Sequence, residues 1–113
     1  MDTLTLAALG EPNRLRIVEL LRDQPCSVGE ITQRLHLSQP QVSKHLRVLS
    51  SAGIVQARPV AQRRVYQLQP EPFAALETWL NTFRPTWNDR LDTLEEYLRE
   101  LHTNQRRGEK RKP

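Results

Sequence analysis

The residues best suited to chemistry lie in one stretch of the sequence, SQPQVSKHLRVLSSAG, which runs from Ser38 to Gly53. Its spacing predicts a helix over 38–53, because Ser38 is a good N-cap, Gln41 completes a capping box, and Gly53 suits the left-handed residue after the last turn. At 100° per residue its apolar side chains fall on one stripe, and its outer face carries cations, amides and hydroxyls without any carboxylate. Such groups hydrogen-bond to phosphates and base edges, so this is the surface chemistry of a helix that enters the major groove of DNA.

A second set of cations follows this helix. After Gly53 the periodicity changes from 3.6 to 2 and predicts two short strands, 54–58 and 64–69, around the turn PVAQR. A β-hairpin tipped with arginines directly after such a helix is a wing, here 58–64, and wings reach the minor groove or the flanking phosphates. The predicted DNA contacts are Ser38, Gln39, Pro40, Gln41, Ser43, Lys44, His45, Arg47, Arg58, Gln62, Arg63 and Arg64.

The charge distribution favours a polyanionic partner. The chain has a formal net charge of +4, yet residues 34–70 hold six Lys or Arg and no Asp or Glu. The ordinary interpretation of a charge run is a solvated face. An acid-free run of this length that also contains a capped, cation-faced helix instead favours double-stranded DNA as the partner.

Capping signals also place the helices that precede this stretch. Residues 3–9 form an apolar segment predicted to be a helix, and Pro12 opens a second helix at the first helical position, where proline is favoured. Ser27 and Glu30 form another capping box, which predicts a third helix over 27–35. Two capped helices joined by a short turn, the second polar on its outer face, make a helix-turn-helix. The predicted fold class is therefore mainly α with a small β-hairpin, a winged helix-turn-helix.

The last long segment is amphipathic. Apolar side chains recur every three or four residues from Phe73 to Leu101, close to a heptad seam, so the segment is expected to pack on another helix. The stripe stays in phase across Pro85, which favours one kinked helix over two separate ones. One copy has too little other apolar surface to cover this seam, so we expect a homodimer joined through its terminal helices. The predicted interface residues are Leu4, Leu6, Leu76, Trp79, Leu80, Phe83, Trp87, Leu91, Leu94 and Leu98. Residues 1–104 form the predicted domain, and 105–113 a basic disordered tail.

Four segments resemble the ArsR-type (arsenical-resistance repressor) family of bacterial winged-helix transcriptional regulators: EPNRLRIVELL, SVGEITQRL, SQPQVSKHLRVLSSAGIV and RRVYQL. They stand in the family's order and spacing and cover roughly residues 6–68. The resemblance implies a homodimer joined by its first and last helices, with two recognition helices facing successive major grooves. It also implies a repressor that leaves its operator when an inducer binds, so a small-molecule inducer stays open as a further partner.

The sequence departs from the metal-sensing members of that family. Those members carry a Cys-x-Cys type signature at the start of the helix before the recognition helix, where this chain has residues 27–31, and Cys26 lies one residue too early. The last helix offers Asp89, Asp92 and a lone His102 in place of paired ligands. We therefore expect no metal site and no cofactor. A redox-sensing role for Cys26 stays open, since it depends on the exposure and pKa of the thiol.

Other function classes find less support. The sequence contains no Ser/His/Asp arrangement, paired carboxylates or Gly-rich phosphate loop, so we expect no enzymatic activity. His45 lies beside the apolar stripe, which favours a packed, hydrogen-bonded or phosphate-touching side chain over a ligand or a catalytic group. The lack of a basic leader and of a long apolar run predicts a cytoplasmic protein. The alternative left open is a winged helix that binds another protein instead of DNA, whose recognition face should then be apolar or of mixed charge.

Overall fold

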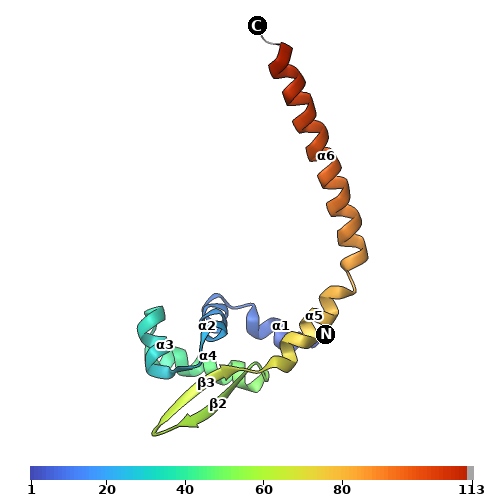
Figure 1. Ribbon diagram of the computed structural model, residues 1–113. Coiled ribbons are helices and arrows are strands. Elements are labelled where there is room, and N and C mark those ends of the chain that lie inside the picture. The colour runs from blue at the N-terminus through green and yellow to red at the C-terminus, as the bar shows by residue number, and fades with distance from the viewer. Residues whose placement is uncertain (112–113) are drawn as a thin grey trace. The chain divides into compact units, whose positions relative to one another are not determined.

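The N-terminal part of the chain consists mostly of helices (Figure 1), and the predicted capping residues Ser27 and Ser38 begin two of them. The structure, a computed structural model, describes the backbone of residues 1–111 and the side chains of residues 1–104. The helices of the N-terminal part are α1 (Thr3–Leu9), α2 (Pro12–Asp23), α3 (Val28–Leu35) and α4 (Gln39–Ser51). Both predicted capping boxes are complete, and Gly53 has a φ of 75°. Because such boxes satisfy the backbone N–H groups left unpaired at a helix start, local sequence sets these bounds.

The strands form a three-stranded antiparallel sheet in the order β1-β3-β2. Their bounds are β1 (Cys26–Ser27), β2 (Val55–Val60) and β3 (Arg63–Leu68). The hairpin turn consists of Ala61 and Gln62 alone, because Val60 pairs with Arg63. The predicted turn, PVAQR, was therefore too long, and the strands extend further toward the tip than expected. Ala61 has a φ of 55°, a left-handed conformation that favours glycine.

Strand β1 was not predicted. It pairs Cys26 with Tyr66 and Ser27 with Val65, so it joins the start of α3 to the hairpin. A strand of two residues is too short to show the alternation by which strands are recognised in sequence. Its position just before the α3 capping box nevertheless makes the sheet and the helix-turn-helix one connected unit.

The apolar stripe predicted for α4 is confirmed as part of the core. Val42, Leu46 and Leu49 are buried, and they pack with Ile17 of α2 and Ile31 of α3. Fully burying one such side chain contributes about 1.5–3 kcal/mol relative to leaving it exposed. Burial of one face fixes the direction of the opposite face, so the core determines which α4 side chains reach solvent.

The last helical segment is two helices, α5 (Pro70–Asn81) and α6 (Arg84–Arg111). The prediction of a single helix kinked at Pro85 was therefore wrong. A proline ring inside a helix clashes with the carbonyl four residues earlier and removes a backbone N–H, so α5 ends before Pro85 reaches that position. The N–H groups of Thr82 and Phe83 close α5 by donating to Trp79 and Leu80 carbonyls at 3.1 Å. Pro85 then occupies the first turn of α6, where proline is tolerated.

The chain divides into two compact units, residues 1–76 and residues 77–113, and α5 crosses the boundary between them. Helix α6 ends at Arg111, whereas side chains are described only as far as Asn104. The expected disordered basic tail, 105–113, lies outside the residues whose side chains are described and stays a prediction, as does the single domain expected over 1–104.

Candidate nucleic-acid interface

The N-terminal end of α4 is fixed by its own first turn. The Ser38 N–H donates to the Gln41 Oε1 atom at 2.9 Å, and the Gln41 N–H donates to the Ser38 Oγ atom at 3.3 Å. Pro40 lies in the same turn, where its missing N–H leaves no hydrogen bond broken. The side-chain Oε1 atom of Gln41 is therefore engaged in the cap, while the side-chain NH2 group of Gln41 is free to donate to a base edge.

The outer face of α4 is exposed and polar. The exposed residues predicted to contact DNA on this helix and its cap are Ser38, Gln39, Pro40, Gln41, Ser43, Lys44 and Arg47. No Asp or Glu belongs to this helix, so no carboxylate on α4 opposes an approaching phosphate. The expected recognition surface is thus brought together on one helix face.

His45 is placed differently from its predicted companions. Its side chain is mostly buried, and its Nδ1 atom lies 3.8 Å from Glu11 Oε2, at the start of α2. Nδ1 has no hydrogen-bond partner among the described residues. The structure therefore favours the packed interpretation of His45 over a contact with phosphate.

The wing carries the second group of predicted contacts. Arg58, Gln62, Arg63 and Arg64 are all exposed. One Nη of Arg58 donates to the Gln67 Oε1 atom across the hairpin at 3.3 Å. Within the described residues, Arg64 makes no hydrogen bond or ion pair. Arg63, in contrast, donates to Glu30 and to the Ser27 Oγ atom, the latter at 3.0 Å.

The Glu30 carboxylate is the acceptor in this group. It receives the Ser27 N–H at 3.2 Å and the Ser27 hydroxyl at 3.0 Å, in addition to the Arg63 guanidinium. The Ser27 backbone N–H, then the Ser27 hydroxyl and Arg63, hold the pKa of Glu30 below its ordinary value. Glu30 is therefore an anion at neutral pH, and it compensates the charge of one wing arginine.

Two further arginines bind backbone groups of neighbouring helices and are not part of the predicted DNA-binding surface. Arg14 donates to the Ala8 carbonyl at 2.6 Å and to the Ala7 carbonyl at 3.3 Å, at the end of α1. Arg16 donates to the Leu35 carbonyl at 3.0 Å, at the end of α3. The Ala7 carbonyl also accepts the Gly10 N–H at 3.2 Å. All three carbonyls belong to the last turn of their helix, where backbone carbonyls lack intrahelical partners, so the cations complete the helix ends. Neither role could be predicted from the sequence, because each partner is a backbone carbonyl of another helix and no spacing rule relates the two.

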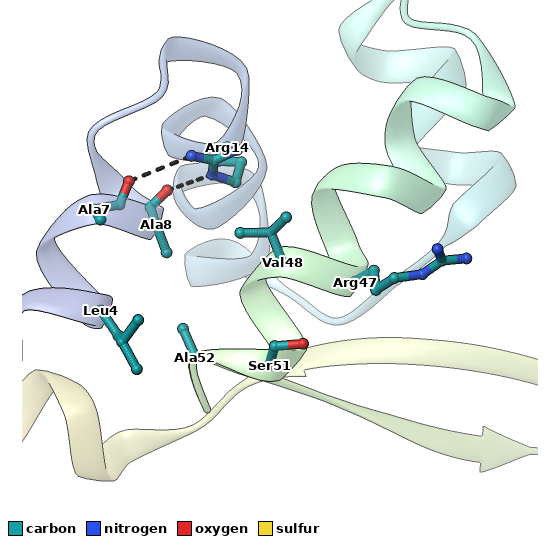
Figure 2. A pocket seen from close by; sticks show the side chains of 8 residues that line it. All are labelled: Leu4, Ala7, Ala8, Arg14, Arg47, Val48, Ser51 and Ala52. Carbon is teal, nitrogen blue, oxygen red and sulfur yellow. Dashed lines mark hydrogen bonds between the residues drawn. The ribbon is translucent and has the colours of Figure 1, made fainter.

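A hollow of about 390 Å³ lies between α1, α2 and α4 (Figure 2). Its wall residues are Leu4, Ala7, Ala8, Arg14, Arg47, Val48, Ser51 and Ala52. Figure 2 shows the guanidinium of Arg14 turned to the Ala7 and Ala8 carbonyls and that of Arg47 pointing away from the hollow. The surface left facing the hollow is largely apolar and includes part of the recognition helix.

Cys26 is a free, fully buried cysteine. Its Sγ–H donates to the Gln24 carbonyl at 3.5 Å. Burial, and secondarily the Glu30 charge, raise the pKa of the thiol above its ordinary value, against an opposing effect of Arg34. Because the thiolate is the reactive form, these conditions count against a redox-sensing role. Within the described residues, no group of three or more His, Cys, Asp or Glu side chains is placed to hold a metal ion.

The residues predicted to form a dimer interface are mostly exposed in the single chain. Exposed members are Leu4, Leu6, Leu80, Phe83, Trp87, Leu91, Leu94 and Leu98, whereas Leu76 and Trp79 are half-buried. Trp87 is 52% exposed, a large apolar side chain to leave in water. The Trp79 and Phe83 rings pack edge to face, with centroids 5.2 Å apart. An exposed apolar row on α6 is what an unpaired interface helix presents.

Among the described helices, none is both long and apolar enough to cross a membrane.

Comparison with known proteins identifies the family. Residues 11–57 match the model of the bacterial regulatory protein, arsR family. The HTH-type transcriptional regulator Rv2034 of Mycobacterium tuberculosis is 49% identical over 76 residues, which are 67% of this chain and 71% of that protein. The HTH-type transcriptional repressor SmtB of the same species is 40% identical over 56% of this chain and 47% of SmtB. The transcriptional activator HlyU of Vibrio cholerae is 39% identical over 63% of this chain and 66% of HlyU.

Solved structures agree with this assignment. The homodimeric winged helix-turn-helix DNA-binding domain of Mb0332 from Mycobacterium bovis, described as a possible ArsR-family regulator, matches with a TM-score of 0.61. That match has 26% identity and covers 74% of this chain and 77% of the other. The resemblance expected from the four sequence segments is thereby confirmed. The chain belongs to the ArsR family of bacterial regulatory proteins and is a DNA-binding transcriptional regulator of the winged helix-turn-helix type.

Proposed function

We propose that this regulator is a homodimeric repressor that binds a two-fold symmetric operator. In each copy, α4 enters a major groove and the wing, 58–64, lies on the minor groove or the flanking phosphates. The observation that carries the proposal is the exposed face of α4, which presents cations, amides and hydroxyls without a carboxylate. Lys44 and Arg47 supply charge to phosphates, and Gln39, Gln41 and Ser43 supply donors and acceptors to base edges.

The homodimer is proposed from two observations. The described part of α6 leaves a row of apolar side chains exposed, including Trp87, Leu91, Leu94 and Leu98. The Mb0332 domain, which has the same winged helix-turn-helix fold, is a homodimer. A second copy brings a second α4, and two recognition helices related by a two-fold axis require half-sites about 10 base pairs apart.

The same surface argues against the alternative, a winged helix that binds another protein. That function requires apolar or mixed-charge residues on the recognition face. Beside Pro40 in its first turn, the exposed apolar residue of α4 is Val48, which faces the hollow in Figure 2. The proposal includes no catalysis, and it places the protein in the cytoplasm, where bacterial DNA lies.

A small-molecule inducer fits the proposal at the hollow between α1, α2 and α4. Its volume of about 390 Å³ lies within the usual range for small-ligand pockets, and its walls are largely apolar. An apolar molecule there would directly contact Val48 of the recognition helix and Ala52, its C-cap. A ligand that binds the free protein and the DNA-bound protein with different affinities would thereby change the affinity of the helix for DNA.

Footprinting of the purified protein on DNA upstream of its own gene tests the proposed function. We expect protection of a two-fold symmetric site, and lower transcription from that promoter in a reporter assay when the protein is present. Protection of one isolated half-site would contradict the dimeric operator. Increased transcription would identify an activator, the activity named for HlyU. An absence of protection at any upstream sequence would overturn the operator proposal.

A further inference from the structure

Three side chains from distant parts of the sequence meet between the wing and the start of α3. Ser27 caps α3, Glu30 completes its capping box, and Arg63 begins strand β3. One Arg63 Nη atom donates both to the Glu30 Oε1 atom and to the Ser27 Oγ atom. We call this group of Ser27, Glu30 and Arg63 the wing junction.

The wing junction lies where the sheet stops supporting the hairpin. Strand β1 pairs with β3 only at Tyr66 and Val65, so Arg63 is two residues beyond the last of these pairs. From there to the turn, β2 and β3 pair only with each other, and a two-stranded hairpin is marginally stable by itself. Among the described side-chain hydrogen bonds, those of Arg63 join this distal part of the wing to a helix.

The two neighbouring arginines of β3 are not equivalent. Successive side chains of a strand point to opposite faces, so Arg63 and Arg64 face opposite sides of the hairpin. Arg63 is paired with an anion, whereas Arg64 makes no ion pair within the described residues. An arginine whose charge is already compensated releases fewer counterions when it meets DNA than one that is free.

We propose, relying on the operator binding proposed above, that Arg63 is a positioning residue and Arg64 is the phosphate contact of the wing. Glu30 and Ser27 hold Arg63, and through it they hold the wing in the orientation required for DNA. A segment held in its bound orientation loses less conformational entropy on binding. The capping box of α3 therefore has a second role, since it also orders the wing.

The second capping box of the chain indicates which substitution of Glu30 to test. The α4 capping box uses Gln41 in the position that Glu30 occupies in α3. An amide at this position completes a capping box, so Glu30→Gln should keep α3 capped while removing the charge that pairs with Arg63. Arg63→Gln removes the other partner, and Arg64→Gln is the matched control from the adjacent position.

Operator affinity is measured against salt concentration for the wild type, the three single variants and the Glu30→Gln/Arg63→Gln double variant. Glu30→Gln and Arg63→Gln should each weaken binding by about two- to thirty-fold without changing the salt slope, because each of the two copies loses one partly exposed ion pair. The double variant should be no weaker than either single variant, because both remove the same interaction. Arg64→Gln should lower the salt slope by about two, because each copy of the dimer loses one phosphate contact.

Tighter binding by Glu30→Gln, with a salt slope lowered by about two in Arg63→Gln, would overturn the proposal, because Arg63 would then be a DNA contact that Glu30 restrains. Unchanged affinity in both variants would overturn it as well.

Hydrogen–deuterium exchange of the free protein provides a measurement that does not depend on DNA. Glu30→Gln and Arg63→Gln should speed exchange of backbone amides in 58–64, while Arg64→Gln should not. Failure of the wild type to bind any operator would count against the proposed function, whereas unaltered exchange would count against the wing junction itself.

Discussion

The Nδ1 atom of His45 lies 3.8 Å from Glu11 Oε2, so the recognition helix faces the N-cap of α2 through a mostly buried side chain. The Glu11 carboxylate also accepts the Arg14 N–H at 2.8 Å. We therefore expect His45→Ala to lower the free energy of unfolding by about 0.5–3 kcal/mol, the usual range for loss of a packed side chain. Urea unfolding measures this change. The salt slope of operator binding should stay as in the wild type, and a reduced slope with unaltered stability would show a phosphate contact instead.

Lys44 is expected to be a phosphate contact with no structural role. It is exposed on α4, away from the buried stripe of Val42, Leu46 and Leu49. Lys44→Glu replaces an attraction to phosphate by a repulsion, so operator affinity should fall by roughly tenfold or more, while the circular dichroism spectrum and melting temperature stay unchanged. Fluorescence anisotropy with labelled operator measures the affinity. Arg22→Glu, an equivalent charge reversal on α2, is the control, and undiminished binding by folded Lys44→Glu would refute the proposed orientation of α4.

The exposed row on α6 predicts that dimerisation depends on Trp87 and Leu94. If a second copy buries these side chains, truncation of the aromatic one should cost about 3–5 kcal/mol, and a buried carboxylate should cost at least as much. Trp87→Ala and Leu94→Asp should therefore yield monomers or poorly folded chains in sedimentation experiments at micromolar concentration. Thr93→Asp introduces the same charge one position away from the row and should remain dimeric. A monomeric wild type at these concentrations would exclude the proposed assembly.

Much of this architecture could be predicted from local sequence, because capping boxes and apolar spacing act within one helix. Ser27 with Glu30 and Ser38 with Gln41 fixed the starts of α3 and α4, and the buried stripe of α4 followed from its spacing. The break before α6 could not be found this way. The apolar stripe continues in phase across it, while the steric effect of Pro85 on the preceding turn decides the break.

The residues of the candidate site could be predicted from the sequence, but the bonds between them could not. The exposed polar face of α4 and the exposed wing arginines were expected from the sequence, although their contacts with DNA stay predictions. The bond between Arg63 and Glu30 spans 33 positions, and no spacing rule relates residues so far apart. The burial of His45 against α2 was likewise a tertiary effect. It depends on where α2 packs, and helical periodicity alone placed the side chain at the edge of the stripe.

The lowered pKa of Glu30 predicts a specific loss of stability in acid. A group whose pKa is lower in the folded than in the unfolded chain stabilises the fold above its unfolded pKa, and this contribution is lost as pH falls through the folded pKa. Urea unfolding at a series of pH values from neutral to acidic should therefore show a steeper decline for the wild type than for Glu30→Gln. Parallel pH profiles for the two proteins would show that the Ser27 and Arg63 contacts do not persist in solution.

Metal ions should not release this protein from its operator. A tight zinc or arsenite site requires three or four ligands around one ion, and an inducing metal must bind the free and DNA-bound states with different affinity. Within the described residues, no group of three or more such side chains is assembled, and Cys26 is buried with a raised thiol pKa. Asp89, Asp92 and His102 are spread along almost four turns of α6, too far apart for one ion, so a site there would need ligands from a partner copy. Titration of the operator complex with zinc and with arsenite, followed by fluorescence anisotropy, should show no release, and Cys26→Ser should behave as the wild type. Release at a stoichiometric, micromolar metal concentration would reveal a site formed between copies, and loss of that release in Cys26→Ser would assign the thiol to it.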